Sequence, residues 1–323
     1  MSTRIHPALA SILGAALWLL AGCASAETPA AAAVGPAASP TRTFTRLPPT
    51  PAVSSPSPAR TLTGRPAASP TANLEEYDST QWSETSPDGQ WELQGTVSFP
   101  RGDSDQYYTR LEVRQISGGH SWPLVDAWMD WSLGYSVPAG IGWSSDGRYL
   151  YYTQRPQPDG CALFVNGSSL VQVDLRTGRQ RTVLDGDQTL WLAISPDDRT
   201  LAYPHREDSM QLVLLDIAGG GAQAVPLDVA ENSVAGALAW APGGSRLAVT
   251  VAIDPCDPLH WEHTILLVDP DTLQARILVP RDERRFVVQE WLDEDTLLLL
   301  DMDDQAWTVD AVSSQLKQLD GQP

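Results

Sequence analysis

The sequence predicts an all-β protein assembled from repeated four-stranded units. A turn built on Ser-Pro-Asp-Gly, or on a close variant, recurs five times at intervals of 58, 51, 46 and 51 residues. An apolar stretch leads into each turn and a second strand follows it, so each turn predicts a hairpin. Strand repeats with a period of about 40 to 50 residues are typical of β-propeller blades. The five turns begin at Ser86, Ser144, Ser195, Ala241 and Leu292.

Each repeat continues with two further strands. The third strand ends in a carboxylate, which is followed by a short turn and a short fourth strand. These carboxylates are Asp174, Asp216, Asp269 and Asp310. Four strands in a radially repeated unit make a propeller blade. We count five blades, and the stretch 118–142 leaves room for a degenerate sixth.

The repeated turn, together with a third strand ending in Val-Asp or Leu-Asp, resembles the WD-like repeats of the TolB-type β-propeller family. The resemblance extends over about residues 78–320 and is strongest in the second and third repeats. It implies a propeller fold and a habit of binding other macromolecules, but no single activity. Members often carry six blades, which keeps the sixth blade open as an alternative.

The N-terminus carries the pattern of a bacterial lipoprotein signal. Arg4 precedes an apolar run over residues 8–21, and Leu-Ala-Gly-Cys closes it at residues 20–23. This run is too short to span a membrane and has the anatomy of a signal peptide. We expect residues 1–22 to be removed and Cys23 to carry the lipid, which places the protein outside the cytoplasm on a bacterial membrane. The alternative is an ordinary secretory signal cleaved after Ala24 or Ala26.

The signal is followed by a linker and one folded body. Pro, Ala, Ser and Thr fill 37 of the 50 positions from 24 to 73, a composition that cannot form a core. We therefore predict a lipidated, disordered tether over residues 23–73. Residues 74–323 have the length of one propeller domain.

The predicted body is strongly acidic. It holds 16 of the 21 basic and 39 of the 40 acidic residues, a net charge of −23. Nucleic acid as a partner is excluded, because binding to phosphates requires cationic contacts. The charge fits a basic partner or cations, or else a solvated acidic surface that keeps an exported protein soluble.

Two cysteines remain in the body, Cys161 and Cys256. Both fall between the second and third strands of their repeats, and disulfides persist in exported proteins. Equivalent loops of a propeller emerge on one face, so we predict a bond between these two cysteines. The alternative is a pair of free thiols.

The same class of loop is the predicted binding face. These connections are expected to be long at 99–108, 155–169 and 253–263, and rigidly held loops often carry function. The predicted binding residues are Arg101, Tyr107, Tyr108, Arg155, His260 and Trp261. The alternative is that they are ordinary solvated loop residues. Trp143, Trp240 and Trp291, which precede turns, are expected to fill the core between blades.

No pattern in the sequence predicts catalysis, a cofactor or a metal. Gly-x-Ser-x-Gly is absent, and His260 with His263 is a weak metal pattern because no helix aligns the two. The leading interpretation is a lipid-anchored binding module of the cell envelope that docks a protein, peptide or glycan. The alternatives are a propeller lyase or hydrolase acting on an extracellular polymer, or a structural part of an envelope complex.

Overall fold

The structure is a computed structural model of the chain, and it describes residues 77–101, 106–130, 136–156, 161, 163–186, 190–257 and 260–319. All of them lie in one compact unit, Pro66–Pro323. Cys23, the predicted signal and the predicted tether lie outside the described residues. Within the described ranges, no helix has the length and apolar character needed to cross a membrane.

Twenty strands form five sheets. The first sheet contains β1 (Tyr77–Thr85), β2 (Trp91–Pro100), β3 (Gln106–Gln115) and β4 (Ser121–Asp130). The second contains β5 (Ser136–Trp143), β6 (Tyr149–Pro156), β7 (Leu170–Asp174) and β8 (Arg179–Leu184). The third contains β9 (Ala193–Ile194), β10 (Thr200–Arg206), β11 (Met210–Asp216) and β12 (Ala222–Pro226). The fourth contains β13 (Ser233–Trp240), β14 (Leu247–Ile253), β15 (Glu262–Asp269) and β16 (Gln274–Asp282). The fifth contains β17 (Val287–Trp291), β18 (Thr296–Leu300), β19 (Ala306–Asp310) and β20 (Leu316–Gln318).

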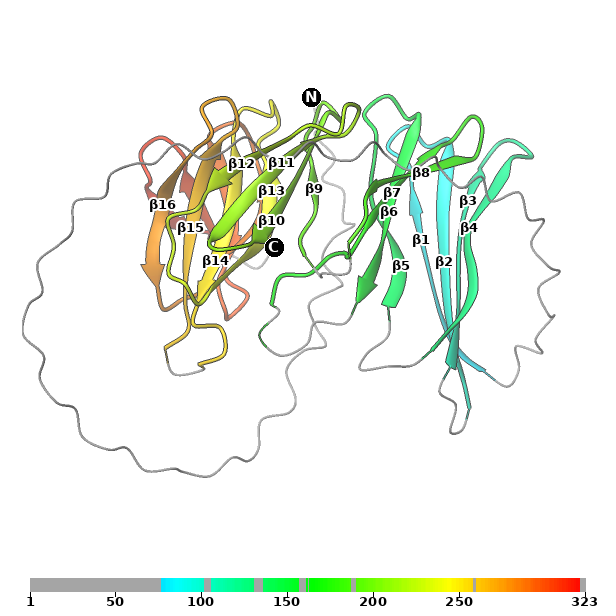
Figure 1. The fold of residues 1–323 in the computed structure, drawn as a ribbon, viewed down its shortest axis with the longest axis horizontal. Helices are drawn as coiled ribbons and strands as arrows, with labels where there is room; N and C mark the ends of the chain where they lie inside the picture. Colours follow the sequence, from blue (N-terminus) through cyan, green and yellow to red (C-terminus); the bar gives the residue numbers. More distant parts are fainter. Residues whose placement is uncertain are drawn as a thin grey trace, which may run out of the picture. The chain divides into compact units, whose positions relative to one another are not determined.

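The predicted all-β architecture is confirmed. Each sheet pairs four consecutive strands antiparallel, which is the blade of a β-propeller (Figure 1). The stretch 118–142, which left room for a sixth unit, instead supplies β4 and most of β5. The five repeats therefore correspond to the five described sheets.

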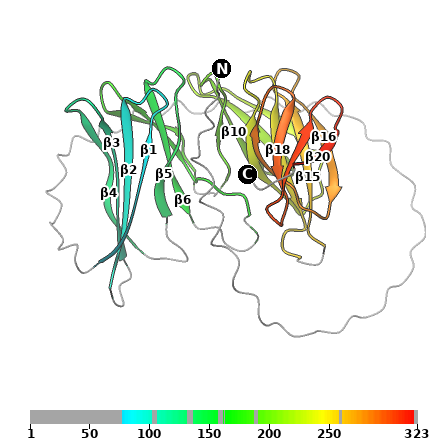
Figure 2. The same cartoon turned by 180° about the vertical axis from the view of Figure 1, so that it is seen from behind.

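The up-and-down order of the strands gives every sheet two distinct ends. The first-to-second and third-to-fourth connections lie at one end, which we call the turn end and which is uppermost in Figure 1. The second-to-third loops and the connections between sheets lie at the other end, the loop end. Figure 2 shows the same arrangement from behind.

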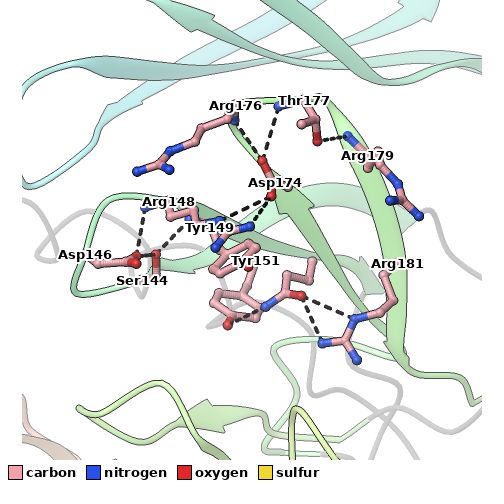
Figure 3. A network of polar contacts seen from close by, with 11 residues as sticks. Ser144, Asp146, Arg148, Tyr149, Tyr151, Asp174, Arg176, Thr177, Arg179 and Arg181 are labelled. Carbon is pink, nitrogen blue, oxygen red and sulfur yellow. Dashed lines mark hydrogen bonds and ion pairs between the residues drawn. The ribbon is translucent and has the colours of Figure 1, made fainter.

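The repeated serine and aspartate build the turn itself. Ser144 Oγ donates to Asp146 Oδ1 (2.7 Å) and accepts the backbone N–H of Tyr149 (2.7 Å), as drawn in Figure 3. The same pair of bonds occurs at Ser86 and at Ser195. The serine and aspartate of the motif therefore form hydrogen bonds within the hairpin, which gives the motif a structural reason to recur.

In the second to fifth sheets, the carboxylate that ends the third strand closes the second turn. Asp174 Oδ1 accepts the backbone N–H groups of Arg176 and Thr177, and its Oδ2 pairs with Arg148 at 3.0 Å (Figure 3). Equivalent backbone bonds end at Asp216, Asp269 and Asp310. In the second sheet, Ser144 thus closes the first turn and Asp174 closes the second.

Apolar packing joins neighbouring sheets in chain order. Separate clusters of buried side chains connect sheets one and two, two and three, three and four, and four and five. The outward face of the first sheet is polar instead, with Arg114 paired to Glu92 at 2.7 Å. Among the described residues, no apolar cluster joins the fifth sheet to the first.

Candidate functional site

A repeated tryptophan contact links the innermost strands of neighbouring sheets. Trp291 Nε1 donates to the carbonyl of Ala239 (2.9 Å), and Trp240 Nε1 donates to that of Ala193 (3.2 Å). In the second sheet, Trp143 Nε1 donates to the carboxylate of Glu84 at 2.8 Å. Each ring thereby fills the inner seam toward the preceding sheet and satisfies its own N–H.

The third sheet breaks this pattern. Ile194 holds the position of the tryptophan, so it offers no N–H to the backbone of Gly142, the residue equivalent to Ala193 and Ala239. A Cβ added to Gly142 would meet no atom within 4 Å. A hollow of about 440 Å³, which we call the inner hollow, occupies this place.

Aromatic, apolar and polar side chains together line the inner hollow. Its lining includes Trp143, Trp191, Trp240, Ile141, Ile194 and Leu238. The polar lining consists of Asn166, Ser145, Ser195 and Asp198, and none of the lining residues is basic. Trp143 and Trp240 were expected in the core; both pack against buried apolar clusters but are only half-buried, and both line the inner hollow.

A second repeated contact joins the outer strands. Trp122, Arg181 and Arg276 occupy equivalent positions in the fourth strands of their sheets. Trp122 Nε1 donates to the carbonyl of Leu175 (3.0 Å), and Arg181 donates to that of Ile217 (3.0 Å). Arg276 donates in the same way to Ala311. Each acceptor lies in the following sheet.

The third sheet breaks the outer pattern as well. Its equivalent residue is Gln223, which pairs with Leu214 in the register, and the corresponding acceptor in the fourth sheet is Pro270. A hollow of about 650 Å³, the outer hollow, lies between these two residues. Asp197, Asp216 and Asp271 line it, again without a basic residue.

The two hollows flank a single turn, Ser195–Asp198, and share Ser195 and Trp240 as lining residues. Asp198 has φ 61° where the first two turns have Gly89 and Gly147. A non-glycine residue rarely adopts this conformation. Asp198 is held there because its Oδ2 accepts the backbone N–H and the hydroxyl of Ser145, both at 2.7 Å.

Hydrogen bonds keep the turn carboxylates charged. The hydroxyl of Ser195 lowers the pKa of Asp197, and Ser86 and Ser144 lower the pKa of Asp88 and Asp146 in the same way. A carboxylate whose ionised form is hydrogen-bonded stays ionised at neutral pH. The turn end therefore presents fixed negative charge around the two hollows.

A crossing segment lies beneath the inner hollow. Phe164 fills the space that a Cβ on Gly236 would need, so the segment after β6 reaches from the second sheet to the fourth. On the way, the Asn166 side chain bonds both the N–H and the carbonyl of Leu192. The segment occupies the place where β9 would otherwise extend toward the loop end, which leaves β9 with only two residues.

Cys161 and Cys256 form a disulfide in the structure, with 5.2 Å between their Cα atoms. Cys161 precedes Phe164 by three residues, so the bond fixes the start of the crossing segment to the connection that follows β14. The disulfide therefore links connections of the second and fourth sheets at the loop end, across the third sheet.

Two of the predicted binding residues lie in strands and not in loops. Tyr107 lies in β3 and not in a loop, because β2 and β3 extend to residues 100 and 106. Its side chain is 1% exposed, and its hydroxyl donates to the carbonyl of Ser136 at 2.7 Å. Arg155 lies in β6, and its Nε is buried without a hydrogen-bond partner. The loop placement was wrong for both, because the strands run further than the turn signals suggested, and Tyr107 is in addition buried.

The other four predicted residues fall into separate groups. Tyr108 lies on the outward face of the first sheet, where it bonds Asp126 and packs against Trp128. Arg101 pairs with Asp78 at 3.1 Å beside the same sheet. Trp261 packs under Arg285 beside the fourth sheet, and His260 bonds Asp257. The structure therefore does not gather the six into one surface.

His263 is a buried structural group. It accepts the Trp261 Nε1–H on Nε2 (2.8 Å), so its Nδ1 carries the proton and donates to the carbonyl of Phe286 (3.1 Å). Burial lowers the pKa of His263 to about 4. Within the described ranges, no group of three or more His, Cys, Asp or Glu side chains is placed to hold a metal ion.

Sequence reasoning missed both hollows, although the signal for one was available. The position before each turn reads Trp, Ile, Trp and Trp in repeats two to five, so Ile194 is the exception. Gln223 is the second exception. It is recognised only from the strand pairing, which shows that Gln223, opposite Leu214, is equivalent to Trp122, Arg181 and Arg276.

No family model matches the chain, and no curated protein matches its sequence. Among solved structures, TolB from Acinetobacter baumannii aligns over 75% of this chain and 55% of its own, with 14% identity and a TM-score of 0.46. The chain is similar in fold to TolB. An oligogalacturonate lyase in complex with manganese aligns over 75% of this chain and 78% of its own, with 18% identity and a TM-score of 0.46.

Porphyromonas gingivalis dipeptidyl peptidase 4 aligns over 74% of this chain at 11% identity, with a TM-score of 0.46. The chain spans 55% of the length of TolB and 39% of that of the peptidase. These similarities concern the fold alone.

Proposed function

We propose that this chain is a lipid-anchored binding module of the bacterial cell envelope, which docks a protein, peptide or glycan at the turn end of its propeller without transforming it. The observation that carries the proposal is the coincidence of two hollows with the two places where the third sheet departs from the repeat. Departures from an otherwise consistent pattern are expected at functional sites. A concave, largely apolar surface with a few polar groups is the usual form of a binding site.

The position of the hollows revises the binding face expected from the sequence. The loop end is crossed by the segment around Phe164 and tied by Cys161–Cys256. The turn end instead offers a hollow lined by the half-buried Trp143 and Trp240 beside the polar Ser195–Asp198 turn. Large aromatic side chains commonly dominate binding energy at interfaces.

The proposed anchor fits this role. A lipid on Cys23 and a tether of about 50 residues let the folded body range tens of ångströms from a membrane, roughly 40 Å if the tether is a coil. The body would thereby search for a partner without leaving the envelope.

A comparison of variants tests the proposal. The full-length chain and its Ile194→Trp variant, which fills the inner hollow, are used to capture partners from detergent-solubilised envelopes of the source bacterium. We expect a component retained by the natural chain to be lost with Ile194→Trp and kept with Glu231→Gln, an exposed acidic residue outside the hollows. Equal retention by all three chains would refute binding at this site, and release of shortened polymer products would instead identify an enzyme.

A further inference from the structure

We infer that the ligand of the turn end is a basic segment of a partner protein, which places arginine or lysine side chains in the two hollows on either side of the Ser195–Asp198 turn. This inference rests on the proposed function and names its ligand. Its basis is the composition of the two linings. Together they supply three tryptophans and four aspartates but no Lys, Arg or His.

The inner hollow suits a cation carried on an apolar stem. The half-buried indole rings of Trp143 and Trp240 line this hollow, and their N–H groups are already bonded to Glu84 and Ala193. An indole face attracts a cation, and arginine also stacks on it. Asp198 supplies the matching charge at the edge of the hollow, since only its Oδ2 is engaged by Ser145.

The outer hollow suits a second cation. Asp197, Asp216 and Asp271 line it, and each of the first two uses Oδ1 for its own turn. Arg199 is the nearest basic residue, but it lies 3.9 Å from Asp197 on an exposed stem and does not line the hollow. In two of the other outer seams an arginine fills this place. A partner's arginine would therefore meet an environment that the fold elsewhere builds for the same side chain.

The remaining charge of the molecule favours the same ligand. Residues 74–323 carry a net charge of −23, which attracts a basic partner over long range and repels acidic polymers. The tryptophan walls then distinguish a true partner from small cations, which gain nothing from an apolar surface. The two hollows share Ser195 and Trp240, so one extended segment can reach both.

The test uses an acetylated, amidated Gly-Arg-Gly-Arg-Gly peptide and its citrulline counterpart, which has the same shape but no charge. Both are titrated into the full-length chain in detergent, by calorimetry and by tryptophan fluorescence. We expect the arginine peptide to bind and to change the emission, with the citrulline peptide at least about tenfold weaker, because charge-assisted hydrogen bonds are lost. Asp198→Asn and Asp271→Asn should each weaken binding several-fold, and Gln223→Arg should abolish occupancy of the outer hollow.

Glu231→Gln is the matched control, since it removes one exposed negative charge outside both hollows. Equal binding of the two peptides, or an equal effect of Glu231→Gln and Asp198→Asn, would overturn the inference. If neither peptide binds but envelope capture still depends on residue 194, the basic ligand is wrong while the proposed function stands. If capture also ignores residue 194, the proposed function fails too.

Discussion

At the scale of single residues, the turn serines have the same structural role in three repeats, and the third of these turns also lines both hollows. Ser86, Ser144 and Ser195 all close their turns with the same bonds. The third turn has Asp198, with a positive φ, where the first, second and fourth have glycine, and its carboxylate reaches back to Ser145 of the neighbouring sheet. A charge placed at a strained backbone position beside a hollow is the clearest local sign of function in the molecule.

His263 gives a prediction of pH dependence. Its pKa is lowered to about 4 from 6.5, so the folded protein keeps the imidazole neutral where the unfolded chain binds a proton. The stability that depends on the neutral form is complete above pH 6.5 and is lost as the pH falls toward 4, by at most roughly 3 kcal/mol. We expect His263→Gln to show a flatter fall in urea-unfolding free energy between these pH values.

The exposed His260 is the control for this measurement. Its pKa is raised by the hydrogen bond to Asp257, so its contribution has the opposite sign, and His260→Gln should not flatten the fall in stability. An unchanged slope in His263→Gln would show that the buried imidazole does not govern the acid sensitivity.

At the scale of elements, two rows of contacts hold the sheets together: the inner tryptophans and the outer donors. Both rows are interrupted at the third sheet, by Ile194 on the inside and Gln223 on the outside. The shortened β9 belongs to the same departure, because the crossing segment takes its place. The third sheet therefore lacks both the inner tryptophan contact and the outer donor contact, and a hollow lies at each of these two places.

The outer row can be completed by substitution. Gln223→Arg supplies the guanidinium found at positions 181 and 276, within the register that directs those donors toward the next sheet. A new hydrogen bond to the carbonyl of Pro270 should raise the unfolding free energy by about 1 kcal/mol. Chemical denaturation measures the change, and Gln223→Lys is the control, since one ammonium lacks the planar fork. A destabilised Gln223→Arg would contradict the equivalence of the three positions.

At the scale of the whole molecule, the disulfide crosses the third sheet and links the second and fourth. It closes 95 residues of chain between Cys161 and Cys256. In the chain-entropy description, a loop of this length stabilises the folded state by about 4 to 5 kcal/mol. The bond also retains the segment that underlies the inner hollow.

Peptide mapping without reduction should find the Cys161 and Cys256 peptides joined. Reduction should lower the melting temperature of the natural chain and leave that of the Cys161→Ser/Cys256→Ser variant unchanged, since only the former has a bond to lose. Complete alkylation of both cysteines before reduction would show that the bond is absent from the mature protein.

The anchor is a prediction of the sequence that concerns the protein's location. Cys23→Ala should leave an unlipidated precursor and shift the protein out of the lipid-modified membrane fraction, because the thiol is the attachment point. Metabolic labelling with a palmitate analogue, followed by fractionation, checks both effects, with Cys161→Ser as the control. A labelled Cys23→Ala protein would refute the lipoprotein assignment.

The sequence by itself determined the class of fold, five recurring hairpin turns and, in four repeats, the turn after the third strand, while a sixth blade stayed open. This was possible because turn chemistry is local: Ser144, Asp146 and Asp174 act on backbone groups within a few residues of themselves. Candidate core tryptophans could be recognised from their place in the repeat for the same reason.

Only the tertiary structure decided which surface is open. Tyr107 and Arg155 were predicted to lie in loops but lie in strands, because the ends of strands depend on pairing and not on local propensity. The inner hollow is lined by Ile194 together with Trp143 and Trp240, which come from other sheets. The outer hollow lies between Gln223 and Pro270 of the next sheet. The candidate site is a property of contacts between sheets, and such contacts join residues about 50 positions apart, beyond the reach of any local pattern.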